Sequence, residues 1–203
     1  MRLHILLVVL IGLPGWLLSA EVSSLADAGP GSLRQALRGG SAVTFSPALA
    51  KQTIMLSETL VIDRAVVIDA SAAPGVTISG GGKTRVVEVK GGEVTIIGLT
   101  IVDGRASAAG QNGNGGGIWT HGGTVLNLKN CIFRNNVALG EGGGAVFVGW
   151  RHTTNVVSCL FENNDGSIPE SERGGGAIAT ASEGKLTVKG CRFINNKGGN
   201  GGG

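Results

Sequence analysis

A strong charge imbalance is the first thing that this chain lacks. Its 203 residues hold 17 basic and 14 acidic side chains, a formal net charge of +3, and the basic residues form no cluster. Proteins that bind nucleic acid usually carry a basic patch or stripe. We therefore expect no nucleic-acid partner.

Long apolar runs are also missing once the first 20 residues are passed. Residues 1–20 carry Arg2, an apolar run that ends at Leu13, a Pro-Gly break and small residues up to Ala20. This order is typical of a secretory signal peptide cleaved after Ala20. An uncleaved anchor is the alternative, but the interrupted run is short for a bilayer span. We expect a secreted or cell-surface protein whose mature chain, residues 21–203, is a single domain without a membrane span.

Glycine and repetition are abundant instead, with 37 glycines in the chain. A Cys-x-Phe-x-Asn-Asn motif occurs three times, and a glycine run keeps step with each copy. The motifs lie at residues 131–136, 159–164 and 191–196, and the glycine runs at 115–117, 142–144 and 174–176. Successive cysteines are 28 and then 32 residues apart, a period that is typical of a solenoid.

The residues between the two signatures predict strands. Leu126 and Leu128 alternate with Asn127 and Lys129, and the later copies largely keep this alternation. A period of two with one apolar face indicates a strand buried on one side. Each repeat then holds three short strands separated by bends, which is one coil of a parallel β-helix. We predict an all-β, single-stranded parallel β-helix.

Coils stacked about 4.8 Å apart would align equivalent side chains into ladders. Asparagine suits the bends because it tolerates left-handed backbone and its amide can bond to the amides above and below. The odd number of cysteines on one inward ladder predicts reduced thiols that pack as small hydrophobes, with a disulfide between adjacent coils as the alternative. The expected ladder residues are Cys131, Cys159, Cys191, Phe133, Phe161, Phe193, Asn136, Asn164 and Asn196.

The two ends of the predicted solenoid differ. Residues 31–39 predict a short capping helix, with Ser32 as N-cap, Gln35 three residues later and Gly39 as the stop. At the other end a new coil begins at Gly201 and no cap follows. Because terminal coils normally carry a cap, we expect a chain truncated at its C-terminus that could self-associate there.

Two segments resemble known families. Gly-Gly-Ala-Val at 143–146 and Gly-Gly-Ala-Ile at 175–178, paired with the Phe-x-x-Asn motifs, are similar to the repeats of polymorphic outer membrane proteins. The stretch 24–37 resembles the opening of many bacterial secreted right-handed β-helix proteins. The resemblance implies an exported, right-handed, pectin-lyase-like β-helix, which in characterised relatives serves as a surface passenger or adhesin.

Three loops join the asparagine bends to the glycine runs, at residues 105–115, 137–142 and 165–174. Since each follows the same point of its coil, we expect them to stack along one edge, the loop edge, and to carry any binding site. Glu141, Asp165 and Arg173 are the weak catalytic candidates there, because paired carboxyls and a cation suit a polysaccharide lyase or hydrolase.

Several motifs that would support catalysis or metal binding are missing. The Asn-Thr-Asp, Asp-Asp and Gly-His-Gly segments of polygalacturonase-like hydrolases are absent from the sequence. The glycine runs lack the aspartate of the calcium-binding Gly-Gly-x-Gly-x-Asp repeat. We therefore expect no metal and no cofactor.

Aromatic residues are scarce, at 4 % of the chain with no tyrosine, yet several gather near the glycine runs. Trp119 and Phe147 each follow an inward position, so we expect them outside and one above the other, with Trp150, Arg151 and His152 just beyond. Trp119, Phe147, Trp150 and Arg151 could stack on sugar rings or mark a protein contact. The alternative is that long loops cover them.

These observations favour a non-enzymatic exported β-helix that presents its loop edge to an extracellular glycan or a surface protein. A polysaccharide lyase or glycoside hydrolase is the alternative.

Overall fold

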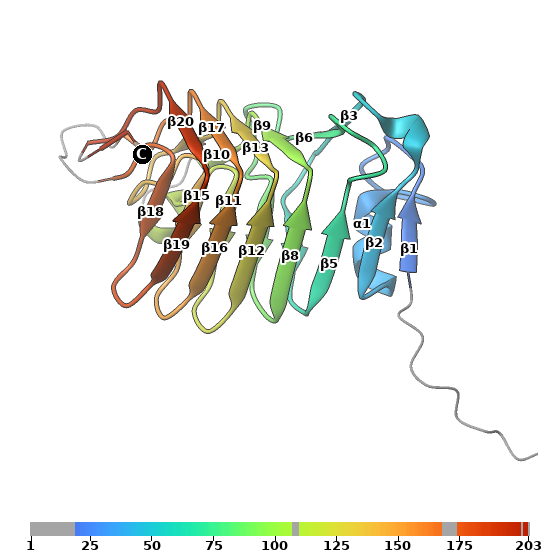
Figure 1. The fold of residues 1–203 in the computed structure, drawn as a ribbon, viewed down its shortest axis with the longest axis horizontal. Coiled ribbons are helices and arrows are strands. Elements are labelled where there is room, and N and C mark those ends of the chain that lie inside the picture. The colour runs from blue at the N-terminus through green and yellow to red at the C-terminus, as the bar shows by residue number, and fades with distance from the viewer. Residues whose placement is uncertain (1–18, 107–109, 168–173, 200, 203) are drawn as a thin grey trace, which may run out of the picture.

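The computed structural model describes residues 19–106, 110–167, 174–199 and 201–202, and these form a parallel β-solenoid (Figure 1). Every strand pairs in parallel with the equivalent strand of a neighbouring coil. Main-chain bonds therefore run from coil to coil, and the predicted all-β parallel β-helix is confirmed.

Three sheets form the walls of the solenoid, and wall A faces the viewer in Figure 1. Wall A consists of β1 (Ser19–Val22), β2 (Ala42–Phe45), β5 (Val66–Asp69), β8 (Glu93–Ile97), β12 (Val125–Lys129), β16 (Thr153–Val157) and β19 (Lys185–Lys189). Wall B consists of β3 (Thr53–Met55), β6 (Thr77–Ser79), β9 (Thr100–Val102), β13 (Ile132–Arg134), β17 (Leu160–Glu162) and β20 (Arg192–Ile194). Wall C consists of β4 (Leu60–Ile62), β7 (Val87–Val89), β11 (Ile118–Thr120), β15 (Val146–Val148) and β18 (Ile178–Thr180).

The apolar core lies between the three walls. Leu126 and Leu128 of β12 are fully buried, and Leu126 pairs with Val94 of the coil before and Thr154 of the coil after. Because side chains alternate across a strand, a one-residue slip would turn this whole face outward. The register read from the later coils thus extends unchanged into the earlier one.

Two consecutive asparagines form each bend after wall B, and they have different structural roles. The first one takes the left-handed backbone, with φ of 56° at Asn135 and 55° at Asn163. The second forms the ladder, since the side-chain amide of Asn136 donates to Asn164 Oδ1, and that of Asn164 to Asn196 Oδ1, both at 2.9 Å. Asn136 and Asn164 are fully buried with their polar atoms bonded, as buried amides require.

The phenylalanine ladder is a stack of parallel rings inside wall B. The centroids of Phe133 and Phe161 are 4.9 Å apart with planes 4° from parallel, and those of Phe161 and Phe193 are 4.9 Å apart at 7°. Phe133 and Phe161 are fully buried, whereas Phe193 on the last coil is 38 % exposed.

The cysteines form a stack of free thiols, as predicted. The main-chain N–H groups of Cys131 and Cys159 donate to the sulfur of the next cysteine along the ladder, each at 3.4 Å. Cys131 and Cys159 are buried and Cys191 is half-buried. The hydrogen bond with Cys131, together with burial, raises the pKa of the Cys159 thiol, so its reactive thiolate is disfavoured.

We expect this stack to show in thiol titration. In the folded protein an aromatic disulfide reagent should label Cys191 and leave Cys131 and Cys159 unreacted for at least about tenfold longer, because only Cys191 is accessible to the reagent. In denaturant all three should react. Fewer than three reactive thiols in the unfolded, unreduced protein would instead reveal a disulfide.

Helix α1 (Leu33–Gly39) covers the first coil beside β1 and β2 (Figure 1). It starts two residues later than Gly31, because the extended Ser32 is its N-cap and accepts from Gln35 N. Leu33, Ala36 and Leu37 face the core, as the capping prediction requires. Gly39 is the last helical residue, and the cap that follows it has extended rather than left-handed backbone.

Of the predicted signal peptide, residues 1–18 lie outside the described part of the chain. Ser19 and Ala20 open β1 and pair with Ala42 and Val43 of β2. Within the described residues no helix has the length and apolar character that crossing a membrane requires.

Candidate functional site

The three loops do begin one above the other along a single edge. The two-residue strand β10 (Arg105–Ala106) pairs with β14 (Val137–Ala138), and Asp165 bridges to Val137 on one side and Lys197 on the other. The loop bases are therefore held by main-chain bonds from coil to coil. This arrangement confirms the loop edge for the residues that the structure describes.

The glycine runs close the loop edge where it meets wall C. Gly115 N donates to Gly142 O at 3.3 Å, and Gly143 N donates to Gly175 O at 2.8 Å. A Cβ added at Gly116 would lie 2.3 Å from the carbonyl oxygen of Val137 in the next coil. Glycine is needed here because the backbones of successive coils approach too closely for a side chain.

The described carboxylates among the catalytic candidates are each engaged by near neighbours. Glu141 accepts from the Asn114 side-chain amide at 3.3 Å, while its own N–H donates to Asn114 Oδ1. Asp165 accepts from the backbone N–H and the hydroxyl of Ser167 at 2.8 and 2.5 Å, and it lies 3.9 Å from Lys197 Nζ. No hydrogen bond between the two carboxylates is found in the described chain.

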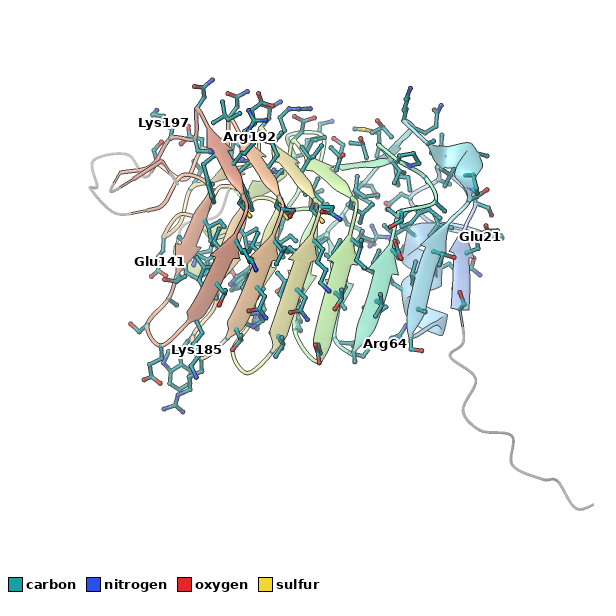
Figure 2. The ribbon with its side chains drawn as sticks, in the orientation of Figure 1. Glu21, Arg64, Glu141, Lys185, Arg192 and Lys197 are labelled. Carbon is teal, nitrogen blue, oxygen red and sulfur yellow. The ribbon has the colours of Figure 1, made fainter. Side chains whose placement is uncertain are left out.

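The remaining catalytic candidate, Arg173, falls outside the described residues. Figure 2 shows Glu141 and Lys197 toward the C-terminal end of the solenoid, far from Arg64 near the capping helix. The two described catalytic candidates, Glu141 and Asp165, thus belong to the later coils.

Trp119 and Phe147 are neighbours in register on β11 and β15, but the prediction that they are exposed is wrong. Their exposed fractions are only 9 % and 3 %. The Arg85 guanidinium lies 4.6 Å from the Trp119 ring centroid, and the His121 ring packs at 4.1 Å. Side chains from the coil before and from the strand end therefore cover the indole.

Arg85 fastens the first loop over wall C. Its Nε donates to Gly115 O at 3.0 Å, and its Nη2 donates to Asn112 O at 2.6 Å and Asn114 O at 2.9 Å. Burial lowers the pKa of the guanidinium, and nearby Glu88 opposes that shift. The group keeps its charge because arginine is not deprotonated in proteins.

Sequence reasoning missed Arg85, although a signal for it was present. Val87 pairs with Ile118, so Arg85 stands level with Gly116, in the column that Gly144 and Gly176 continue in later coils. The backbones of successive coils approach closely at this column of glycines. An arginine in the column has no space beneath it, so its side chain lies across the next coil. The early coils lack the Gly-Gly-Ala signature, which is why this substitution was not seen.

The outer face of wall C also carries a charged cluster that the sequence did not reveal. Glu88 pairs in register with Trp119, and its carboxylate lies 2.7 Å from His121 Nε2 and 3.6 Å from Lys90 Nζ. This cluster and the buried indole together form a surface that is more polar than the expected aromatic ladder.

A polar pocket of ≈ 200 Å³ opens at the loop edge beside Arg85. It draws on three successive coils and contains three cationic side chains and no carboxylate. Its lining residues are Thr59, Lys83, Thr84, Arg85, Arg105, Ala106 and Asn112. A larger hollow of ≈ 510 Å³ adjoins it through Thr59 and reaches α1.

Trp150 and Arg151 lie at the opposite end of wall C, in the turn after β15. Trp150 is 50 % exposed, and the Arg151 guanidinium packs 4.1 Å from its ring centroid while also pairing with Glu183 at 2.8 Å. His152, expected on the same surface, is instead fully buried. Of the four predicted binding residues, Trp119 and Phe147 are thus buried, whereas Trp150 and Arg151 are exposed at a turn away from the loop edge.

The structure is a β-solenoid of parallel coils with an asparagine ladder, and its stacked loops project along one edge. The family model described as "Right handed beta helix region" matches residues 57–202, more than half of the chain. The chain therefore belongs to the right-handed β-helix family. A comparison with curated proteins finds no match.

Proposed function

We propose that this protein is an exported or cell-surface β-helix that binds an extracellular glycan or a surface protein along its loop edge without catalysing a reaction. The observation that carries the proposal is the continuity of this edge. β10, β14 and the bridge at Asp165 tie three successive loops together by main-chain hydrogen bonds.

Such an edge suits an elongated partner. Its loops repeat with the spacing of the coils, about 4.8 Å, so that a linear ligand can meet equivalent positions in succession. Bases held by coil-to-coil bonds limit the loss of loop freedom on binding. Residue identities vary from loop to loop, which provides specificity on a constant scaffold.

The sequence favours binding over catalysis. The Asn-Thr-Asp, Asp-Asp and Gly-His-Gly segments of polygalacturonase-like hydrolases are absent from it. Glu141 and Asp165, the described carboxylates among the candidates, are bonded to Asn114 and Ser167. We accordingly retain lyase or hydrolase activity as an outcome of the test.

Blocking the loop edge tests the binding role. Glu141 is exposed there, so Glu141→Trp is expected to weaken binding to a ligand found by glycan array or cell adhesion by about tenfold or more, through steric obstruction. Lys129→Trp on the outside of wall A is the matched control and should bind like the wild type. Equal binding by both variants would remove the loop edge from consideration.

Catalysis is examined by incubating the wild type with pectate, alginate and glycosaminoglycans. We expect neither unsaturated products nor new reducing ends. Products that disappear in the Asp165→Asn variant would replace the binding proposal with an enzymatic one.

A further inference from the structure

We propose that the pocket lined by Lys83, Arg85 and Arg105 binds the carboxylate or sulfate groups of an acidic glycan. The inference rests on the proposed function and deepens it by naming the ligand class and its subsite. The pocket lies where a coil without the sequence signatures meets the first of the three loops.

The pocket is built before any ligand arrives. Arg105 N donates to Thr84 O at 2.9 Å, which locks the start of the first loop onto the preceding coil. The hydroxyls of Thr59 and Thr84 are 3.0 Å apart, and this hydrogen bond links the coil of Thr84 to the coil that precedes it. Bonds between three successive coils thus fix the backbone positions from which the cations extend, together with the two hydroxyls, and this lowers the entropy lost on binding.

Two of the three cations in the pocket, Lys83 and Arg105, have no carboxylate partner among the described residues, whereas Glu88 lies near Arg85 outside the pocket. Arg34, Arg134 and Arg151 all pair with a carboxylate, with N–O distances of 2.6 to 2.8 Å. By contrast, no salt bridge within the described ranges involves Lys83 or Arg105, and no acidic residue lines the pocket. Neighbouring like charges are unfavourable, so an anion placed among them gains attraction to all three.

Arg85 supplies a donor in a fixed position. Its Nε and Nη2 bond to carbonyls of the loop, while its Nη1 has no hydrogen-bond partner among the described residues. The guanidinium is further held against the Trp119 ring. Lys83 is exposed and Arg105 is half-buried, so both side chains can donate hydrogen bonds to the carboxylate or sulfate oxygens of a ligand that also contacts Nη1.

The size and surroundings of the pocket favour a glycan over other polyanions. A volume of ≈ 200 Å³ accommodates one charged sugar substituent, and the threonine hydroxyls offer bonds to its neighbouring hydroxyls. The adjoining hollow is lined by three arginines and by two carboxylates, Glu58 and Asp63, and it leaves room for a glycan chain to continue past the pocket. Duplex nucleic acid gains its affinity from many phosphate contacts, which three cations do not provide.

Calorimetric titration of the full chain tests the pocket with four probes: a sulfated glycosaminoglycan, polygalacturonate, neutral dextran and duplex DNA. We expect binding of at least one anionic glycan, weakened by salt, and none of dextran. The double variant Lys83→Ala, Arg105→Ala should lose about tenfold or more in affinity, because charge-assisted hydrogen bonds are the strong ones. Circular dichroism verifies that each variant is folded.

Two matched variants separate the pocket from the overall charge. Lys129→Ala with Lys189→Ala removes the same charge from exposed sites on wall A and should bind like the wild type. Lys83→Arg with Arg105→Lys keeps both charges and should retain most of the affinity. Preference for the sulfated or the carboxylated polymer identifies the anionic group.

The outcomes keep the two proposals apart. If a neutral glycan or a protein binds and the Lys83→Ala, Arg105→Ala variant binds equally well, the pocket is overturned while the loop-edge function stands. If the wild type binds no glycan, protein or cell surface, both fall. Duplex DNA binding as tightly as the best glycan would show that the ligand class is wrong.

Discussion

Replacing Phe161 with alanine is expected to lower the free energy of unfolding by about 3 to 5 kcal/mol, as for a large side chain removed from a packed core. Phe161 is fully buried and stacks between Phe133 and Phe193, each 4.9 Å away. Its removal leaves a cavity with an unsupported ring on both sides. Neighbouring coils cannot close that cavity because hydrogen bonds of wall B fix their separation.

Urea unfolding followed by circular dichroism measures the loss. Phe193→Ala is the matched control, since Phe193 has one stacking partner and is 38 % exposed, so a smaller loss of about 1 to 2 kcal/mol is expected. A loss below about 1 kcal/mol for Phe161→Ala would contradict the inward register, because core phenylalanines cost more than that.

Acid is expected to destabilise the protein through His152. This residue is fully buried at the corner between walls C and A, and its Nδ1 lies 3.1 Å from the His121 carbonyl oxygen. The Thr124 hydroxyl donates to the same carbonyl at 2.9 Å and so accepts from Nδ1, which places the proton of the neutral ring on Nδ1. Its Nε2 has no hydrogen-bond partner among the described residues, nor has the Thr154 hydroxyl two residues further on.

Burial lowers the pKa of His152 from 6.5 to about 4, and the hydrogen bond to the His121 carbonyl only partly opposes the shift. Between these two values the unfolded state binds one more proton than the folded state, so the free energy of unfolding decreases as the pH falls from 6.5 to 4. The difference in pKa corresponds to a loss of about 3 kcal/mol across this window. Above pH 6.5 the residue has no further effect.

Unfolding in urea at several pH values between 7 and 4 tests this expectation. His152→Gln removes the titrating group and should make the stability curve flatter by about 3 kcal/mol over the window, whatever its stability at pH 7. His121→Gln is the control, because His121 is partly exposed beside Glu88. An unchanged pH dependence in His152→Gln would show that the ring titrates normally.

The early and the later coils of the solenoid differ in the charged side chains that they place on the loop edge. The later coils carry the glycine and asparagine signatures, and their loop carboxylates are engaged by neighbours. The cations of the pocket come instead from Lys83 and Arg85, on a coil without those signatures, and from Arg105 at the start of the first loop. The pocket that we propose as a binding site therefore lies at the early end of the loop edge, where the chain departs from the later repeat.

The repeat alone was enough to determine the coil. The spacing between Cys131, Phe133 and Asn136 is the same in all three copies of the motif, and each coil pairs with a copy of itself, so the register and the three ladders follow from local pattern. The N-cap at Ser32 was equally local, because a helix start depends on residues within one turn.

The tertiary structure decided what covers the outer faces. Alternation correctly placed Trp119 outside the coil, but its burial depends on Arg85 from an earlier coil that bears no signature. The burial of His152 likewise depends on how one corner packs against Thr124 in the coil before. Periodicity in sequence specifies which face a side chain takes, whereas exposure depends on long side chains and loops whose reach no periodic pattern encodes.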